Sequence, residues 1–285
     1  MNSGWSILYR GPLSSCNYAC GYCPFAKTAN TAAELREDET RLQRFVDWAR
    51  DRPEQIRILF TPWGEALIHR YYQRALCELS HLPNVRRVAI QTNLSCRLDW
   101  LARANPDTLA LWCTFHPDET RLESFIAQCR RLDDHEFRYS VGLVGTRENL
   151  AHLEDLRREL QPAVYVWVNA FKREPGYYSE AEIEFISAVD PFFPINNRHH
   201  PSLNRACRTG HTVFTVDGNG DLRRCHFVAT VLGNIYEPGF EAALKPRLCP
   251  VATCGCHIGY VHLEDLSLEK VYGDGLLERI PHRRW

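Results

Sequence analysis

The chain of 285 residues lacks three features that would indicate a membrane, nucleic-acid-binding or secreted protein. It has no apolar run near the roughly 20 residues that a transmembrane helix needs, so no membrane partner is expected. Its formal net charge of -1 gives no overall basic field, so no nucleic-acid partner is expected either. The N-terminal residues lack the charged head and apolar stretch of a secretory signal, so we expect a cytoplasmic protein. Internal repeats and low-complexity tracts are also absent.

Cysteine, in contrast, is abundant, with twelve residues. In a cytosolic protein, clustered cysteines bind metal more often than they form disulfides. Eight of the twelve fall in two groups, at 16–23 and 207–256. The remaining four lie in apolar segments and are predicted to be small buried hydrophobic residues, namely Cys77, Cys96, Cys113 and Cys129.

Residues 1–190 alternate short apolar runs with longer amphipathic ones. Helical periodicity is clear at Leu42–Ala49, Leu122–Cys129 and Leu150–Leu160. Successive strand–helix units predict a parallel sheet with right-handed crossovers, and six units are fewer than a closed barrel requires. We therefore expect an α/β fold, a partial (β/α)6 TIM-like barrel with its reactive end at the carboxyl ends of the strands. The predicted strands are Trp5–Tyr9, Ile56–Phe60, Arg87–Thr92, Leu109–Phe115, Phe137–Val144 and Val164–Asn169.

Residues 191–285 have a different character. A proline-rich stretch at 190–201 indicates a linker. Beyond it, two strand-like runs, His211–Val216 and Leu222–Phe227, flank the turn signal Asp217–Asp221 and predict a β-hairpin. This part is too short to bury much core, so we expect a small cysteine-rich domain that is stabilised by metal.

The first cysteine group lies on the loop after the first predicted strand. Cys16, Cys20 and Cys23 have the spacing C-x3-C-x2-C, with the aromatic Tyr22 just before the third cysteine. Three thiolates on one short loop can hold three irons of a [4Fe-4S] cluster and leave the fourth iron open to a small molecule. The alternative is a zinc site with a fourth ligand from elsewhere, although zinc loops usually pair two C-x2-4-C units.

This loop resembles the signature of the radical S-adenosylmethionine (radical SAM) superfamily, C-x3-C-x-aromatic-C after strand one. In the segment after the second strand, Gly64 and Glu65 match the family's Gly-Gly-Glu-Pro, whereas Trp63 and Ala66 depart from it. The resemblance covers roughly residues 5–190. Its further features follow in the family's order, namely Gln91–Leu94, Gly142–Glu148 and Asn169.

The resemblance implies an enzyme whose cluster, held by Cys16, Cys20 and Cys23, binds and reductively cleaves S-adenosylmethionine. The 5′-deoxyadenosyl radical so formed would remove a hydrogen atom from a substrate. An external reductant such as flavodoxin or ferredoxin would be a partner. His116 has an alternative interpretation as an ordinary strand-end histidine. The cofactor-binding residues that the resemblance implies are Tyr22, Gly64, Glu65, Thr92, Asn93, His116, Gly145 and Asn169.

The second cysteine group resembles the auxiliary-cluster extension of radical SAM enzymes, the twitch or SPASM-like domain. The resemblance implies one auxiliary [4Fe-4S] cluster, with Cys207 and Cys225 as its firm pair of ligands. Two of Cys249, Cys254 and Cys256 would complete the set, with Cys249 and Cys254 favoured. Four thiolate ligands would make the cluster an electron relay, whereas three would leave an iron for substrate. A zinc-stapled hairpin is the alternative.

The substrate is less clearly indicated. Lys172 and Arg173, just beyond the sixth strand, form a candidate substrate patch for an anionic group, with a solvated loop as the alternative. We expect oxidation, cyclisation or epimerisation of a small molecule, because a first strand at Trp5 leaves no room for an N-terminal peptide-binding domain. The alternatives are a peptide-modifying maturase and, outside the enzymes, an iron–sulfur electron carrier or zinc-stapled binding protein. Arg283–Trp285 would either fold over the cavity or fray.

Overall fold

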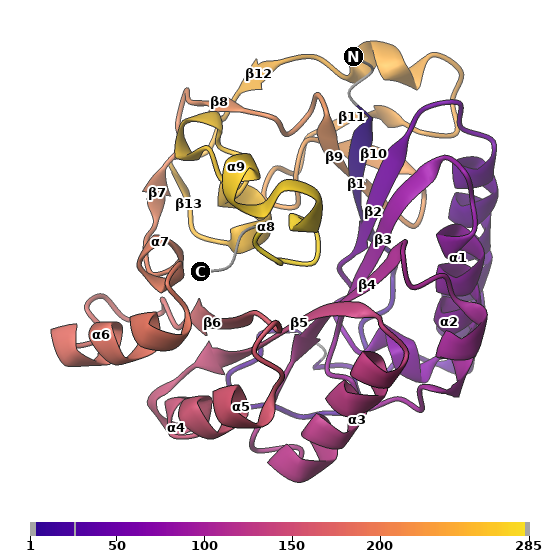
Figure 1. Cartoon of the computed structure of the whole chain (residues 1–285). Coiled ribbons are helices and arrows are strands. Elements are labelled where there is room, and N and C mark those ends of the chain that lie inside the picture. Colours follow the sequence, from indigo (N-terminus) through magenta and orange to yellow (C-terminus); the bar gives the residue numbers. More distant parts are fainter. Residues whose placement is uncertain (1–3, 26, 283–285) are drawn as a thin grey trace.

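The computed structural model describes residues 4–25 and 27–282 (Figure 1). Arg283–Trp285 lie outside the described residues. One large sheet has the strand order β11-β10-β9-β1-β2-β3-β4-β5-β6, in which β1 to β6 run parallel, and it curves into an open crescent. The expected α/β fold with a largely parallel sheet is confirmed. The six parallel strands are β1 (Trp5–Arg10), β2 (Ile56–Phe60), β3 (Val85–Thr92), β4 (Leu109–Thr114), β5 (Arg138–Gly145) and β6 (Val166–Ala170).

The C-terminal hairpin continues this sheet instead of standing apart from it. Strand β9 (Val213–Asp217) pairs parallel with β1, and β10 (Asp221–Arg223) and β11 (Val231–Asn234) add antiparallel strands beyond it. The turn between β9 and β10 needs glycine, since Gly220 has φ +87°. The predicted hairpin is therefore present, and it shares hydrogen bonds with the barrel. The boundary between domains at residue 190 stays a prediction.

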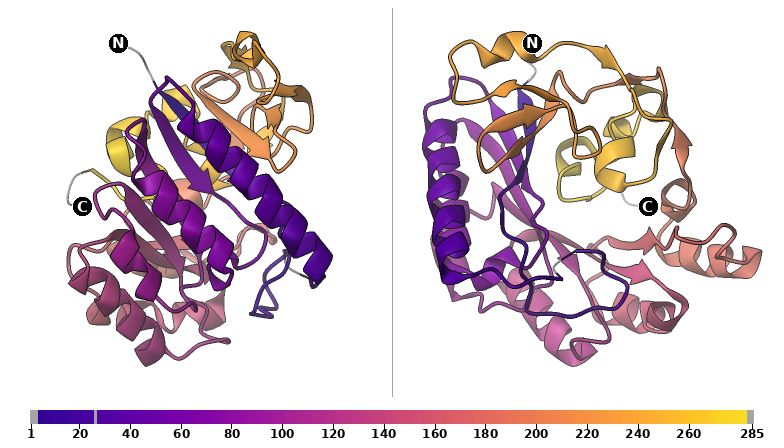
Figure 2. Two further views of the ribbon diagram at one scale, coloured as in Figure 1. Left: turned by 90° about the vertical axis from the view of Figure 1, so that its right-hand side faces the viewer. Right: turned by 180° about the vertical axis from the view of Figure 1, so that it is seen from behind.

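Helices cover the convex face of the sheet (Figure 2). Helix α1 begins with a capping box between Thr31 and Glu34, and its apolar stripe is buried against the strands. The single helix predicted over Leu150–Leu160 is wrong, because α4 ends at Leu150 and α5 begins at Leu153. The α-helices are α1 (Ala32–Arg50), α2 (Arg70–Ser80), α3 (Leu122–Asp134), α4 (Arg147–Leu150), α5 (Leu153–Glu159), α6 (Glu180–Val189), α7 (Phe193–Asn196), α8 (His257–Tyr260) and α9 (Glu269–Tyr272).

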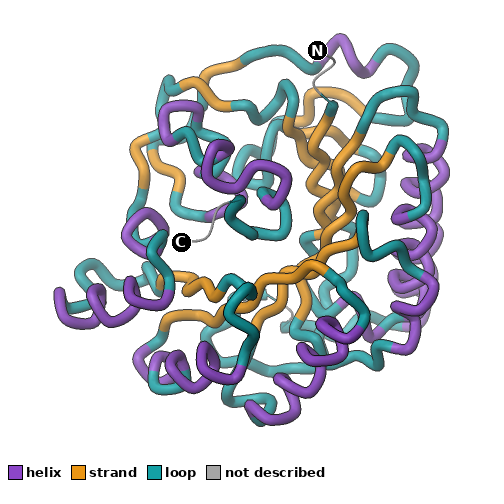
Figure 3. The backbone as a smooth tube through the Cα atoms, viewed as in Figure 1, coloured by secondary structure: helices purple, strands orange, loops and turns teal. Residues whose placement is uncertain are grey.

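The concave side of the crescent is filled by the C-terminal segment (Figures 1 and 3). Inward-facing side chains of the strands, among them Trp112 and Trp167, pack in one cluster with Ile258 and Leu277. The convex side holds the larger core, and there the four scattered cysteines are buried as expected. Within the described residues, no helix is both long and apolar enough to span a bilayer. The 3-10 turns are η1 (Ala66–Ile68), η2 (Asp99–Arg103), η3 (Phe240–Ala243), η4 (Glu264–Leu266) and η5 (Gly273–Gly275).

Two short ribbons link the C-terminal segment together. Strand β8 (Ala206–Cys207) pairs with β12 (Arg247–Leu248), and β7 (His200–Pro201) pairs with β13 (Thr253–Cys254). Each ribbon therefore carries a cysteine of the second group into a backbone ladder.

Candidate functional site

The loop of the first three cysteines joins β1 to α1 at the carboxyl ends of the parallel strands (Figure 2). A cavity of about 150 Å³ opens beside it, and Cys16, Cys20 and Cys23 all line it. Cys20 is buried and the other two are half-buried. The ends of β2, β3 and β4 supply five more of the predicted site residues to the same cavity, namely Gly64, Glu65, Thr92, Asn93 and His116. Strands far apart in sequence thus meet the cysteine loop at one place.

Gly64 seats the cysteine loop on the end of β2. A Cβ atom at this position would lie 1.7 Å from the carbonyl oxygen of Ser15, so only glycine fits. The next residue, Glu65, donates its backbone N–H to the same oxygen at 3.2 Å. The close approach therefore fixes Cys16, which follows Ser15, against the Gly64–Glu65 segment.

Two side chains that the sequence analysis missed hold the rest of the loop. Asn30 Oδ1 accepts hydrogen bonds from the backbone N–H groups of Ser14 and Ser15, at 2.8 and 2.9 Å. Glu119 Oε1 accepts from the backbone N–H of Ala19 at 2.8 Å. The only sequence signal was the place of Asn30 beside the start of α1, because nothing local links Glu119 to a loop 100 residues away.

Glu65 is buried at the centre of the site. Its carboxylate accepts hydrogen bonds from Thr92 Oγ1 at 2.9 Å and from the backbone N–H groups of Leu67 and Asn93, at 2.9 and 2.6 Å. Burial raises the pKa of Glu65 to about 7. The carboxylate ties the ends of β2 and β3 together and leaves a buried anionic group beside the cavity.

Asn93 and Thr92 end β3 next to the cysteines. Asn93 Nδ2 donates to Asn17 Oδ1 at 3.1 Å and lies 3.9 Å from Cys16 Sγ. The predicted pair therefore lies within reach of the first cysteine.

Tyr22 and His116 interact with each other. The Tyr22 hydroxyl lies 2.7 Å from His116 Nδ1, the rings stack with centroids 5.9 Å apart, and Cys20 Sγ lies 3.3 Å from the same nitrogen. Burial lowers the pKa of His116 to about 4, so the imidazole is neutral at neutral pH. Tyr22 itself does not appear among the residues that line the cavity.

Gly145 and Asn169 lie on β5 and β6, outside the lining of the cavity. A Cβ atom at Gly145 would lie 2.6 Å from the Tyr178 hydroxyl, which donates to the Gly145 carbonyl. A close packing contact alone therefore accounts for this glycine. Asn169 is half-buried and pairs with Val144 in the ladder.

The two cations of the candidate substrate patch diverge. Lys172 Nζ donates to the carbonyl oxygens of Asn196 and Gly255, and burial lowers its pKa to about 8. Arg173 donates to the carbonyl oxygen of Tyr22 at 2.7 Å. Lys172 thus braces the C-terminal segment and Arg173 braces the cysteine loop, and they do not face one common cavity lining.

The five C-terminal cysteines differ in exposure. Cys207, Cys225 and Cys249 are buried and Cys254 is half-buried. The pKa of Cys254 is raised to about 12, first by burial and then by the thiols of the other four. Burial also raises the pKa of Cys225, with the thiols of Cys207 and Cys249 adding to the effect.

Cys256 differs from these four. Its residue is exposed, whereas the other four are buried or half-buried. Burial of the thiol raises the pKa of Cys256, and the cations Lys172, Arg10 and Arg279 oppose that rise.

The donor sets fit clusters better than single ions. None of the twelve cysteines, all of which are described, forms a disulfide. Within the described part of the chain, no three histidine, cysteine or acidic side chains converge on one metal ion. In an iron–sulfur cluster each thiolate binds a different iron, so the thiols stand further apart than the ligands of one ion. Three thiols on one loop and a second group of cysteines provide thiols in the number that such clusters use.

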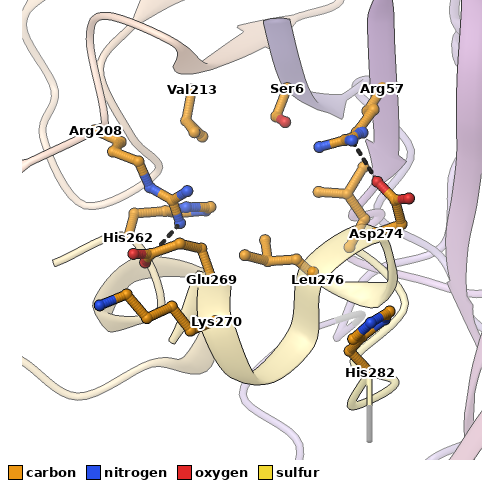
Figure 4. A pocket seen from close by; sticks show the side chains of 12 residues that line it. Ser6, Arg57, Arg208, Val213, His262, Glu269, Lys270, Asp274, Leu276 and His282 are labelled. Atoms are coloured by element: carbon orange, nitrogen blue, oxygen red, sulfur yellow. Dashed lines mark hydrogen bonds and ion pairs between the residues drawn. The ribbon is translucent and has the colours of Figure 1, made fainter. Parts of the chain in front are cut away.

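A second cavity of about 410 Å³ opens at the opposite, amino end of the strands (Figure 4). Its charged side chains pair across it: Arg57 with Asp274 at 2.5 Å, and Arg208 with Glu269 at 3.8 Å. The Arg57–Asp274 pair links the C-terminal segment to β2, whereas Arg208 and Glu269 both belong to residues 191–285. In each pair the two charges largely neutralise one another.

No protein-family model matches the chain, and no curated protein sequence matches it either. Solved structures do match. Native anSMEcpe with bound AdoMet and Cp18Cys peptide is 13% identical, with 84% of this chain and 82% of that chain covered and a TM-score of 0.53. Histidine-tagged anSMEcpe with bound AdoMet is 13% identical, with 85% and 79% covered and a TM-score of 0.54. BtrN in complex with AdoMet and 2-DOIA is 16% identical, with 86% and 89% covered, but its TM-score is 0.36.

At these identities the likeness to anSMEcpe establishes the fold, and the match to BtrN corresponds only in outline. The chain has the overall fold of AdoMet-binding anSMEcpe, in agreement with the resemblance to the radical SAM superfamily.

Proposed function

We propose that this protein is a radical SAM enzyme that removes a hydrogen atom from a small-molecule substrate. The observation that carries the proposal is the convergence of three thiols, Cys16, Cys20 and Cys23, on one cavity with Gly64 and Glu65 at the reactive end of the barrel. A non-catalytic electron carrier would not need this cavity. The fold shared with AdoMet-bound anSMEcpe supports the same function.

The roles of the residues follow from their places. Cys16, Cys20 and Cys23 would hold a [4Fe-4S] cluster, which when reduced supplies the electron that cleaves S-adenosylmethionine to a 5′-deoxyadenosyl radical. Glu65, a buried carboxylate beside the cavity, suits the amino group of the cofactor. Thr92 and Asn93 orient that carboxylate.

His116, Tyr22, Gly145 and Asn169 remain proposed cofactor contacts with different support. The neutral imidazole of His116 lines the cavity, and Tyr22 packs behind it. Gly145 and Asn169 would reach the cofactor only if it extended along β5 and β6 beyond that lining.

We propose an auxiliary [4Fe-4S] cluster held by Cys207, Cys225, Cys249 and Cys254. The burial of Cys207, Cys225 and Cys249 and the half-buried position of Cys254 support this set over one that includes the exposed residue Cys256. Four protein thiolates would close the coordination of the cluster and suit it to passing electrons. We further propose a cytoplasmic enzyme with an external reductant such as flavodoxin or ferredoxin.

A small-molecule substrate is supported by a third cavity, which lies at the same end of the barrel as the cysteine cavity. It has a volume of about 620 Å³, shares Trp63 with the cysteine cavity and is also lined by Arg10 and His226. Pockets for small molecules range over about 300–1,000 Å³. Lys172 and Arg173 remain proposed substrate-binding residues. Their support is indirect, because each side chain stabilises a loop. The reaction class we favour is oxidation, cyclisation or epimerisation.

Peptide modification is the second candidate, and one observation favours it. A matching anSMEcpe structure holds a peptide, and 82% of that chain is covered. Trp63, Phe25 and Phe227 are also exposed around the cavities, as apolar contacts for a peptide would be.

The test of the proposed function is 5′-deoxyadenosine formation. Anaerobically reconstituted protein with dithionite and S-adenosylmethionine should form 5′-deoxyadenosine, and a substrate should stimulate its formation. A metabolite pool and a peptide pool, assayed separately, distinguish the two substrate classes. No 5′-deoxyadenosine from protein with a loaded cluster, with either pool, would contradict the proposal.

A further inference from the structure

Two segments around the C-terminal cysteines contain no aspartate or glutamate. They are residues 191–216 and 242–263, although the whole chain has 35 acidic residues. The same segments contain five lysines and arginines, namely Arg198, Arg205, Arg208, Lys245 and Arg247. The whole chain has a net charge of -1, so these two segments differ from the rest of the chain in their excess of positive charge.

These segments lie side by side. In the β8–β12 ribbon, Leu248 pairs with Ala206 and Arg247 with Cys207. Beyond it the backbone N–H of Asn204 donates to the carbonyl of Cys249 at 2.8 Å. The ladder resumes where β7 pairs with β13. One continuous ribbon therefore covers the second group of cysteines.

The outer side of this ribbon is apolar. Leu248 and Leu203 are 58% and 55% exposed, more than any other large hydrophobic side chain among the described residues. Along each strand an exposed residue stands next to a buried thiol: Leu248 precedes Cys249, and Ala206 precedes Cys207. Because neighbouring side chains of a strand point to opposite faces, the exposed residues lie directly over the buried thiols.

Cations rim the apolar pair. Arg198 and Lys245 are exposed, and neither has an ion-pair partner within the described ranges 4–25 and 27–282. Arg247 is held in place by the carbonyl oxygens of Gly210 and Lys245, at 3.0 and 3.1 Å. Arg205 pairs with Asp265, Arg208 pairs with Glu269, and Arg247 lies on the same face as its strand partner Cys207, so the positive charge of the outer side comes from Arg198 and Lys245.

We propose that this surface, made of Leu203, Leu248, Arg198 and Lys245, docks a one-electron carrier protein with an acidic face. The inference rests on the proposed function, because it assumes an iron–sulfur centre on the thiols beneath. One electron passes between the carrier and that centre, so the one-electron oxidation of one balances the reduction of the other. The apolar pair supplies contact area over the shortest path to the thiols, and the cations select an acidic partner.

The test measures binding and electron transfer in the holoenzyme, with an acidic flavodoxin as the probe. We compare the double variant Arg198→Glu/Lys245→Glu with the control Arg36→Glu/Arg70→Glu, whose two arginines are exposed on α1 and α2. The first should weaken flavodoxin binding, measured as Kd, by about tenfold or more and slow oxidation of reduced flavodoxin to a similar degree. Binding of flavodoxin to the wild type should also weaken as ionic strength rises.

Dithionite is a small reductant that can reduce the clusters without docking on the proposed surface. With it, the Arg198→Glu/Lys245→Glu variant should form 5′-deoxyadenosine at the wild-type rate, which also shows that the variant folds. The single variant Leu203→Asp, which keeps Arg198 and Lys245, should also weaken flavodoxin binding. If neither the wild type nor the variants form 5′-deoxyadenosine with dithionite, the proposed function is wrong. The measured flavodoxin affinities test the docking surface independently of that result.

Three results would overturn the docking proposal. One is unchanged flavodoxin binding in the first double variant. Another is weaker binding only in the Arg36→Glu/Arg70→Glu control, which would place the carrier on the helical side of the barrel. The third is a change of oligomeric state in the first double variant with unchanged flavodoxin binding, which would make a second copy of the chain the occupant.

Discussion

The two groups of cysteines are built in opposite ways. Cys16, Cys20 and Cys23 lie on an irregular loop beside a cavity, and distant side chains hold that loop from outside. In the second group, Cys207 and Cys254 lie in short backbone ladders, and three of the group's thiols are buried. The buried Arg224 braces this region by donating to the carbonyl oxygen of Leu248.

This difference indicates that the two cysteine sites have different functions. A loop that presents three thiols to a cavity can expose part of a cluster to a small molecule. In the proposed second set, three buried thiols and one half-buried thiol would close the cluster to other ligands and leave electron transfer as its function. The first site therefore depends on positioning, whereas the second depends on burial and on thiol count.

The largest expected effect is the loss of the first site. Cys20→Ser should abolish 5′-deoxyadenosine formation and remove about four irons per chain, because one of three cluster ligands is lost. Iron analysis and product assay measure both. Cys77→Ser is the matched control, since Cys77 is buried outside both groups and should leave the iron content unchanged. Equal iron loss in the two variants would contradict the assignment of the loop.

The second group is tested by comparing two of its own members. Cys225→Ser should lose about four irons per chain while S-adenosylmethionine still perturbs the spectrum of the remaining cluster. Cys256→Ser should keep about eight irons, because the proposed ligand set leaves out this exposed residue. Iron loss in Cys256→Ser but not in a Cys254→Ser variant would reverse the choice between them.

Gly64→Ala tests whether the first site depends on positioning. The added Cβ would collide with the Ser15 carbonyl, 1.7 Å away, and should lower the free energy of unfolding by about 1–3 kcal/mol. The rate of 5′-deoxyadenosine formation should fall by up to about 100-fold, because the loop shifts relative to Glu65. Gly21→Ala is the control, since Gly21 lies in the same loop with no heavy atom within 4 Å of the added Cβ. Similar losses in both variants would contradict the specific contact.

The smallest effect is expected at Asn30. Asn30→Ala leaves two backbone N–H groups without their acceptor, at a cost of about 1 kcal/mol each in the free energy of unfolding. Asn30→Asp keeps the acceptor oxygen and should retain most of the stability and product formation. Chemical denaturation and the product assay compare the two. An aspartate variant as impaired as the alanine variant would show that the acceptor is not what matters.

Local patterns predicted much of this molecule. The bounds of β2 agree at both ends, because a continuous apolar run between polar residues leaves little choice. The pairing of β9 with β1 joins segments more than 200 residues apart, and no local pattern encodes it. The same holds for Glu119, whose contact with the cysteine loop appears only once the strands are assembled. The sequence therefore allows the motif residues to be proposed, whereas side chains such as Glu119 that hold the loop in place become visible only in the assembled fold.

The most direct test of two unlike cysteine sites is low-temperature EPR of the reduced, reconstituted protein with and without S-adenosylmethionine. The account predicts signals from two [4Fe-4S] clusters, of which only one changes when S-adenosylmethionine is added, and that one disappears in Cys20→Ser. A single cluster signal, two signals that both ignore S-adenosylmethionine, or a colourless zinc protein would contradict it.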